Sequence, residues 1–348
     1  MHQNHTSAFF QTNETARVTL VGERRSPDEI MHEHFGSDYR VYRRRWCESE
    51  RFAYRPDLPI HLDVDTNYTC NLRCIMCPLG TRGFPVRYER KFLDFDLYRK
   101  ALMEGAAGGL CSVRLGLTGE PLLRPDILDF VRLARELKIL DIMLITNGLL
   151  LTPELSRELI QAGLTRLMVS VDALRPETYR RIRRGGELAA VRQNILTFLD
   201  IRESLRLELP LLRVSFVKMS VNASEIEDFR YFWTGRADYI SFQEYTNIIG
   251  SEETSYFSGA RRLAKTFRCP DPWQRMSLFV NGDLFPCCSD FGRLAPVANL
   301  NKVSLAEAWL SERAEYYRAL HKEGRWSEDQ ICRRCALNST GQEESQAR

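Results

Sequence analysis

The sequence predicts an α/β protein built on a parallel sheet, and three observations support that prediction. Six segments of strand type alternate with five amphipathic segments of helix type between residues 59 and 248. No hairpin turn joins two of these strands directly, which is typical of parallel strands connected by helices. The chain of 348 residues is also long enough to bury a large core without disulfides. An open or closed barrel, or a doubly wound sheet, is therefore expected.

Each element of this alternation has its own sequence signal. The strands alternate apolar and polar residues or form short apolar runs. The helices carry start and stop residues, such as Thr152 and Pro153 at one beginning and Gly163 at the end of the same helix. The expected strands are 61–66, 112–117, 142–146, 167–171, 211–219 and 239–242. The expected helices are 95–104, 125–138, 153–163, 188–205 and 224–235, the last opened by a capping box of Ser224 and Glu227.

The segments outside residues 59–248 do not show this alternation of strands and helices. Residues 1–58 form a polar N-terminal extension, in which a capping box of Ser26 and Glu29 predicts a short helix ending near residue 35. Residues 249–268 are rich in Ser, Glu and Gly and are expected to be a linker. A hairpin around Asn281-Gly282 and a helix over 304–321 follow in a small domain, 269–336, before a polar tail, 337–348. The six-stranded unit itself spans 59–248.

Composition restricts the class of protein. No apolar run reaches the roughly 18 residues of a membrane span, and the N-terminus lacks the pattern of a signal peptide. The net charge of +3 is too small to indicate nucleic acid or a membrane surface as a partner. We therefore expect a cytoplasmic protein, whose ten cysteines stay reduced and serve as metal ligands where they cluster.

Three cysteines lie directly after the first predicted strand. Cys70, Cys74 and Cys77 have the spacing C-x3-C-x2-C. Three thiolates on one compact loop can bind three corners of a 4Fe–4S cube and leave the fourth iron open to a small molecule. A structural zinc site is the alternative, but zinc takes four ligands and no fourth Cys or His lies close in sequence.

Several motifs in this region resemble those of the radical SAM enzymes. The cysteine loop follows the first strand, Thr118-Gly119-Glu120-Pro121 follows the second, and Thr146-Asn147-Gly148 ends the third. The resemblance implies a partial (β/α)6 barrel that binds S-adenosyl-L-methionine (SAM) at the carboxyl ends of its strands. It also implies reductive cleavage of SAM to methionine and a 5′-deoxyadenosyl radical. The residues expected to contact SAM are Met76, Thr118, Gly119, Glu120, Asn147, Ser170, Asp172, Arg183, Ser215 and Gln243.

A second set of cysteines, Cys269, Cys287, Cys332 and Cys335, follows the barrel. This arrangement resembles the twitch domain, a shortened SPASM domain that follows some radical SAM barrels. The resemblance implies a second, fully ligated 4Fe–4S cluster, with a four-cysteine zinc site as the alternative. Cys288 adjoins Cys287 but should face the other way, because neighbouring residues in an extended segment point to opposite sides.

The resemblance also gives an expectation of function. Proteins with a twitch domain resemble 2-deoxy-scyllo-inosamine dehydrogenase and related sugar-modifying enzymes. We therefore expect hydrogen abstraction from a sugar, aminocyclitol or nucleoside and oxidation of a carbinol to a ketone, as in antibiotic and other natural-product biosynthesis. A radical epimerase with Cys288 as hydrogen donor, a decarboxylase and a peptide-modifying maturase are the alternatives. A reducing partner such as flavodoxin or ferredoxin is expected in every case.

Overall fold

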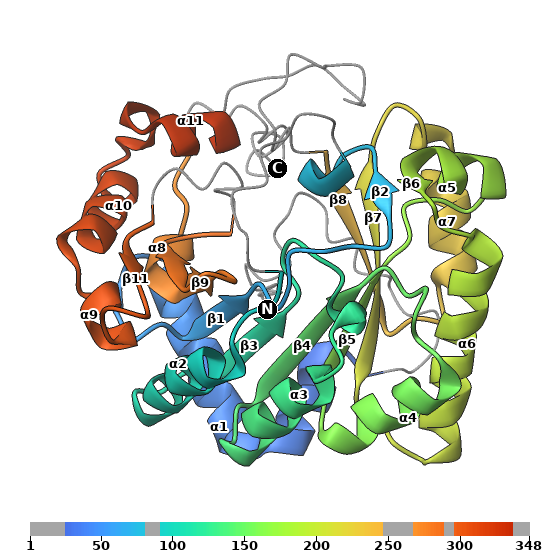
Figure 1. Ribbon diagram of the computed structural model, residues 1–348, viewed down its shortest axis with the longest axis horizontal. Coiled ribbons are helices and arrows are strands. Elements are labelled where there is room, and N and C mark those ends of the chain that lie inside the picture. The colour runs from blue at the N-terminus through green and yellow to red at the C-terminus, as the bar shows by residue number, and fades with distance from the viewer. Residues whose placement is uncertain (1–24, 81–90, 246–266, 289–295, 337–348) are drawn as a thin grey trace, which may run out of the picture.

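A nine-stranded sheet forms the centre of the computed structural model, which describes residues 25–80, 91–245, 267–288 and 296–336. The strand order is β11-β10-β9-β1-β3-β4-β5-β7-β8. The six strands from β1 to β8 in this order run parallel and curve into part of a barrel with helices on its outer side (Figure 1). The predicted fold class, a partial α/β barrel followed by a small domain, is confirmed.

The barrel strands lie close to their predicted positions. They are β1 (His61–Val64), β3 (Ser112–Leu115), β4 (Asp141–Thr146), β5 (Arg166–Ser170), β7 (Leu211–Lys218) and β8 (Tyr239–Glu244). The helices between them are α2 (Phe95–Ala107), α3 (Ile127–Glu136), α4 (Pro153–Ala162), α5 (Pro176–Ile182), α6 (Leu188–Ser204) and α7 (Ile226–Trp233). A 3-10 turn precedes α7, and no side chain caps that helix, so the capping box predicted at Ser224 is wrong.

The two faces of the barrel strands differ in chemistry. Apolar residues such as Leu62, Val113 and Val214 point outward and form one continuous core beneath the helices. The alternate positions point into the barrel and are polar or charged, as Asp63 and Arg114 show, although Asp63 is fully buried. A binding or catalytic site is therefore expected in the polar interior of the barrel and at the strand ends above it.

The N-terminal helix is longer than the sequence indicated. The capping box of Ser26 and Glu29 is present, but α1 (Pro27–Glu50) continues past a kink at Gly36, which has a φ of 60°. Its buried residues Tyr39, Tyr42 and Trp46 pack against Ile60, Leu211 and Tyr239 at the beginnings of the strands. The helix therefore covers the amino-terminal end of the barrel, opposite the end that carries the cysteine loop.

The C-terminal segment continues the barrel sheet. Strand β9 (Arg275–Leu278) pairs in parallel with β1, and β10 (Asp283–Phe285) and β11 (Ala298–Asn299) follow it in antiparallel order. The hairpin was predicted, but its pairing with β1 was not. The helix expected over 304–321 is divided into α9 (Leu305–Trp309) and α10 (Glu312–Lys322), because Ser311 caps a new helix. Helices α8 (Asp271–Gln274) and α11 (Gln330–Ala336) complete this part.

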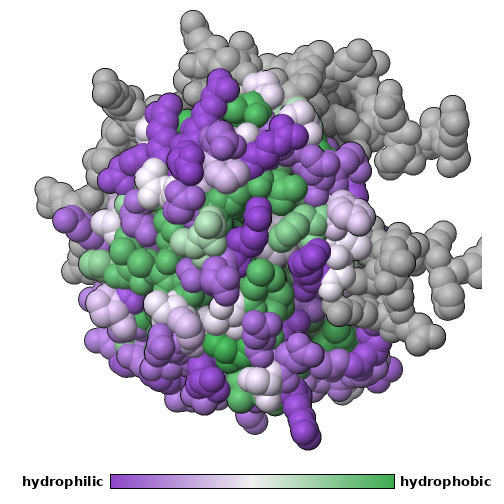
Figure 2. All heavy atoms as spheres, turned by 90° about the vertical axis from the view of Figure 1, so that its right-hand side faces the viewer, coloured by the Kyte–Doolittle hydropathy of each residue, from purple (hydrophilic) through white to green (hydrophobic). Residues whose placement is uncertain are grey.

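The outer surface is mixed in polarity. Figure 2 shows the side that faces right in Figure 1, where hydrophilic side chains alternate with hydrophobic ones. None of the helices in the described part of the chain is long and apolar enough to cross a membrane.

Candidate active site

The three cysteines of the first motif share one loop above the carboxyl ends of the strands, with Cys74 buried and Cys70 and Cys77 partly buried. Cys74 belongs to β2 (Arg73–Cys74), which pairs with β6 (Arg183–Arg184), and the backbone N–H of Cys77 donates to the carbonyl of Cys74 at 3.1 Å. Burial raises the pKa of all three thiols, that of Cys74 to about 12. The thiols also raise one another's pKa, so they lie close together. Loading with iron must therefore release their protons.

Glu120 lies beside this loop as a buried carboxylate. It is 2% exposed, and its backbone N–H donates to the carbonyl of Thr69 at 2.8 Å. Its carboxylate accepts hydrogen bonds from the Thr146 hydroxyl and from the backbone N–H of Asn147, each at 2.7 Å. Burial raises its pKa despite these donors. A nearby ammonium group would favour the ionised form, so the site suits the amine of SAM.

The neighbouring motif residues are fixed by close contacts. A side chain on Gly119 would place its Cβ 2.3 Å from the carbonyl oxygen of Asn67, so this position requires glycine. The backbone N–H of Thr118 donates to Asp65, and the Asn147 amide donates to Asn71 within the cysteine loop. These contacts join the ends of β1, β3 and β4 into one rigid surface around Glu120.

Asp172 and Arg183 form a buried ion pair beside the cysteine loop. Asp172 is fully buried, with a φ of 65°, and one carboxylate oxygen accepts from the Arg183 Nε at 2.9 Å. The other oxygen accepts from the backbone N–H of Val217 at 2.7 Å. Both carboxylate oxygens of Asp172 thus accept hydrogen bonds from the protein and hold Arg183 in place, and a direct contact of Asp172 with SAM stays a prediction. Arg183 in turn lies 3.8 Å from the sulfur of Cys74.

The other predicted SAM contacts lie around the same end of the barrel. Ser170 and Ser215 are register partners near the ends of β5 and β7, and Gln243 lies near the end of β8. Met76 packs against a small apolar cluster that includes Ile182 and Tyr245. A SAM-binding role for these four residues stays a prediction.

The second cysteine set also gathers in space. Burial and the charge of Asp271 raise the pKa of the Cys269 thiol, and the thiols of Cys335 and Cys287 raise it as well, so the three cysteines lie near one another. Cys332 lies on α11, with its sulfur 3.3 Å from the Nε2 of His321. In the described residues no three Cys, His, Asp or Glu side chains converge as ligands of a single metal ion would. A 4Fe–4S cube does not require this, since each thiolate binds a different iron.

His321 is a functional candidate that the sequence did not reveal. Its Nδ1 accepts the backbone N–H of Cys269 at 3.1 Å, so its Nε2 carries the proton and donates to the Cys332 sulfur. Burial lowers its pKa to about 4, so the ring is neutral at pH 7. Eleven residues separate His321 from Cys332, and only the packing of α10 against α11 brings them together.

Cys288 differs from its neighbour. The groups that perturb its pKa include Arg114, Asp63 and Arg275, which belong to the barrel strands β3, β1 and β9. Asp271 raises the pKa of both Cys288 and Cys269, whereas Cys335 and Cys287 raise only that of Cys269. Cys288 therefore lies within electrostatic range of charged residues on β1, β3 and β9, and its expected orientation opposite to Cys287 stays a prediction.

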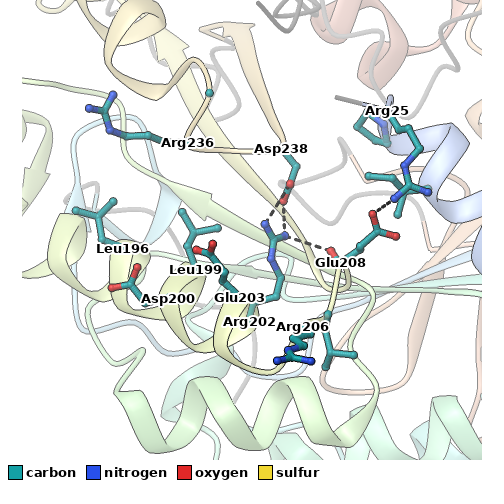
Figure 3. A pocket seen from close by; sticks show the side chains of 14 residues that line it. Arg25, Leu196, Leu199, Asp200, Arg202, Glu203, Arg206, Glu208, Arg236 and Asp238 are labelled. Carbon is teal, nitrogen blue, oxygen red and sulfur yellow. Dashed lines mark hydrogen bonds and ion pairs between the residues drawn. The ribbon is translucent and has the colours of Figure 1, made fainter. Parts of the chain in front are cut away.

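A surface pocket of about 650 Å³ lies at the other end of the barrel. Residues from the end of α6 and from the segments before β7 and β8 line it (Figure 3). In Figure 3, Arg202 donates to Asp238 at 3.2 Å and to the Glu208 carbonyl at 3.3 Å. It also donates to the Pro210 carbonyl at 2.7 Å. None of the predicted site residues lines this pocket.

Comparison with known families identifies two domains in the chain. Residues 64–203 match the model of the radical SAM superfamily, and residues 269–336 match that of the SPASM iron–sulfur cluster-binding domain. The chain therefore contains a radical SAM domain followed by a SPASM domain. Its cofactors are SAM and two 4Fe–4S clusters, as expected. The cysteine sets and the buried Glu120 described above fit these groups chemically.

Among curated proteins, the chain is similar to GTP 3′,8-cyclases. It is 36% identical over 171 residues to that of Heliobacterium modesticaldum, covering 49% of this chain and 50% of the relative. A probable GTP 3′,8-cyclase of Methanocaldococcus jannaschii is 38% identical over 171 residues, covering 49% of this chain and 54% of the relative. The chain thus spans about half the length of the curated relatives it matches.

Solved structures share the fold at low identity. SuiB of Streptococcus suis, bound to S-adenosylmethionine, has a TM-score of 0.63 and 16% identity, covering 86% of this chain and 76% of that one. BtrN, in complex with AdoMet and 2-DOIA, has a TM-score of 0.54 and 17% identity, covering 82% of this chain and 94% of that one. These likenesses show the fold alone.

The expected sugar chemistry is wrong. The matching relatives are GTP 3′,8-cyclases, so carbinol oxidation in antibiotic biosynthesis is not supported, nor are the epimerase, decarboxylase and peptide-maturase alternatives. That expectation came from the small number of cysteines in the C-terminal domain. A cysteine count describes how many clusters are held, whereas the substrate is selected by side chains inside the barrel.

Proposed function

We propose that this protein is a radical SAM enzyme that abstracts hydrogen from a purine nucleotide such as GTP. The observation that carries the radical chemistry is the buried Glu120 beside the loop of Cys70, Cys74 and Cys77. When the three-cysteine cluster is bound and reduced by one electron, it supplies cleavage of SAM to methionine and a 5′-deoxyadenosyl radical. A reducing partner such as flavodoxin or ferredoxin would provide that electron.

The residues around the loop have separate tasks in this proposal. Glu120 binds the amine of SAM, and the donors from Thr146 and Asn147 hold its carboxylate in one orientation. Arg183, fixed by Asp172, places a positive charge beside the Cys74 sulfur. Ser170, Ser215 and Gln243 line the side where the rest of SAM would lie. The barrel interior beneath them would take the substrate and shield the radical from solvent.

The nucleotide part of the proposal rests on the relatives named above. Their shared region is the one that carries the radical SAM motifs, and their name describes ring closure between positions 3′ and 8 of GTP. The second cluster of this chain, held by Cys269, Cys287, Cys332 and Cys335, would be fully ligated and could exchange electrons with the substrate.

The test is an anaerobic reaction of the reconstituted protein with SAM, dithionite and GTP carrying deuterium at C3′. The proposal predicts 5′-deoxyadenosine that contains one deuterium, measured by mass spectrometry, and a GTP-derived product. Unlabelled 5′-deoxyadenosine without consumption of GTP would contradict the nucleotide assignment but leave SAM cleavage intact. No 5′-deoxyadenosine under any condition would contradict the radical chemistry itself.

A further inference from the structure

The two-stranded sheet of β2 and β6 carries Cys74 on one face and exposed arginines on the other. Cys74 and its register partner Arg183 are each 7% exposed, whereas the second register pair, Arg73 and Arg184, is exposed. Side chains alternate across a strand, so one face of this sheet points to the cysteine loop and the other to solvent. Figure 1 shows the sheet beside α5. Two surface cations therefore lie one backbone layer away from a predicted cluster ligand.

The charges of Arg73 and Arg184 lie opposite each other across the two strands. The guanidinium of Arg73 donates to the carbonyls of Cys70 and Leu72, each at 2.7 Å, which holds it over the cysteine loop. In the part of the chain that the structure describes, neither arginine forms an ion pair. Like charges directly opposite each other in a sheet are destabilising. An anionic partner that covers both side chains would offset this repulsion.

Other arginines close by in sequence do have acidic partners. Arg180 lies 3.3 Å from Glu187, and Arg175 lies 3.6 Å from Asp228. The two charges of each pair largely cancel for an approaching partner. The exposed face of β2 and β6 thus presents positive charge that the protein itself does not neutralise.

The predicted cluster beneath this face indicates which anionic partner it takes. The cluster of the cysteine loop must gain one electron before SAM can be cleaved, and the β2–β6 sheet is the layer between Cys74 and solvent. A protein electron carrier must bring its redox centre close to the cluster. Two cations suit a carrier with carboxylates around that centre, whereas a nucleic acid is bound through a longer row of phosphate contacts.

We propose that the exposed face of β2 and β6, marked by Arg73 and Arg184, is the docking surface for an acidic electron-carrier protein. The inference rests on the proposed function, since it requires the three-cysteine cluster, but it does not depend on the identity of the substrate. The reduced carrier loses one electron and the cluster gains it, and no bond forms or breaks. Arg73 and Arg184 attract and orient the carrier.

The probe is oxidised flavodoxin, an acidic carrier, titrated calorimetrically into the reconstituted protein at low ionic strength. Arg184→Glu is expected to weaken flavodoxin binding by about tenfold or more, because attraction to the carrier becomes repulsion. The same change places a carboxylate opposite Arg73, so the thermal midpoint should not fall. Added salt should weaken binding by the wild type more than binding by the variant.

Arg206→Glu is the matched control. Arg206 is also an exposed arginine, but it lines the pocket at the other end of the barrel. The control makes the same change in net charge, so it should bind flavodoxin like the wild type if the position of the charge decides docking.

Electron transfer provides a second measurement. With flavodoxin hydroquinone as the reductant, Arg184→Glu should release 5′-deoxyadenosine from SAM about tenfold or more slowly than the wild type. With excess dithionite the two proteins should release it at the same rate, because a small reductant needs no docking surface. The difference between the two reductants separates docking from damage to the cluster.

Three results would overturn the docking surface. They are equal flavodoxin affinity in wild type and Arg184→Glu, an equal loss in Arg206→Glu, and a loss of dithionite-driven release in Arg184→Glu, which would assign Arg184 to the cluster loop itself. Binding of a fluorescent single-stranded oligonucleotide that is lost in Arg184→Glu, with flavodoxin affinity unchanged, would replace the carrier by a nucleic acid. The calorimetric titration needs no turnover, so its outcome is separate from that of the deuterium experiment.

Discussion

The guanidinium of Arg183 lies 3.8 Å from the sulfur of Cys74 and is held there by the carboxylate of Asp172. Arg183 and Cys74 are register partners of the two short strands β2 and β6. The backbone pairing of β2 with β6 therefore places the positive charge of Arg183 beside Cys74, a predicted ligand of the cluster. Burial raises the pKa of the Cys74 thiol, and Arg183 is the strongest influence that lowers it.

Removal of this charge should destabilise the fold through Asp172. Arg183→Met leaves a fully buried carboxylate without its cation, which typically costs about 3–5 kcal/mol. The double variant Arg183→Met with Asp172→Asn should recover much of that loss. Chemical denaturation of the three proteins measures the coupling, and strictly additive losses would show that the pair is not an ion pair.

Glu120→Ala should weaken SAM binding. The change removes a charged acceptor from the amine of SAM, which is worth about 1.5–3 kcal/mol, or roughly 10- to 100-fold in affinity. Equilibrium dialysis with labelled SAM on the reconstituted protein measures the effect. Glu136→Ala, at the exposed end of α3, is the control and should bind SAM like the wild type. Unchanged affinity in Glu120→Ala would remove Glu120 from the SAM site.

Substitution of His321 should change the reduction potential of the second cluster. A donor to a cluster sulfur stabilises the reduced, more negative state, so His321→Leu should lower the reduction potential. Each kcal/mol of lost stabilisation corresponds to about 40 mV for one electron. His321→Gln can keep a donor near the Nε2 position and should retain more of the potential than His321→Asn. Redox titration followed by electron paramagnetic resonance measures the potential, and equal potentials in all four proteins would exclude the hydrogen bond.

The stability of the fold should fall in mild acid through His61. Burial lowers the pKa of this histidine to about 4, from an ordinary value near 6.5. The unfolded chain therefore takes up a proton between these values while the folded chain does not. Stability is complete above pH 6.5 and decreases by up to about 3 kcal/mol as the pH falls to 4.

His61→Gln provides the test of this pH dependence. Glutamine can still donate to Asp63, which the ring contacts at 2.8 Å, but it does not titrate. Denaturation at pH 7 and at pH 4.5 should show a smaller difference in the variant than in the wild type. An identical difference in both proteins would mean that His61 is charged in the folded state.

Much of this architecture was predictable, because local patterns determine it. The barrel strands have strong apolar alternation, and motifs such as Gly119-Glu120-Pro121 lie at their ends. The features that the sequence did not predict depend on tertiary contacts. No sequence signal near Arg275 indicates that β9 pairs with β1. The buried face of α1 beyond Gly36 can be recognised only when the strands against which it packs are known. The substrate class was mispredicted because the motifs describe the SAM chemistry, whereas the substrate is selected by inward side chains that the motifs do not specify.

The most direct test of SAM cleavage at the three-cysteine loop measures 5′-deoxyadenosine released from SAM by the reconstituted protein with dithionite. The wild type is compared with a variant in which Cys70, Cys74 and Cys77 are all changed to Ala. The wild type should hold about eight irons and release 5′-deoxyadenosine. The variant should keep about four irons, in the second cluster, and release none above the protein-free blank. Release by the variant at the wild-type rate would contradict the assignment of SAM cleavage to this loop.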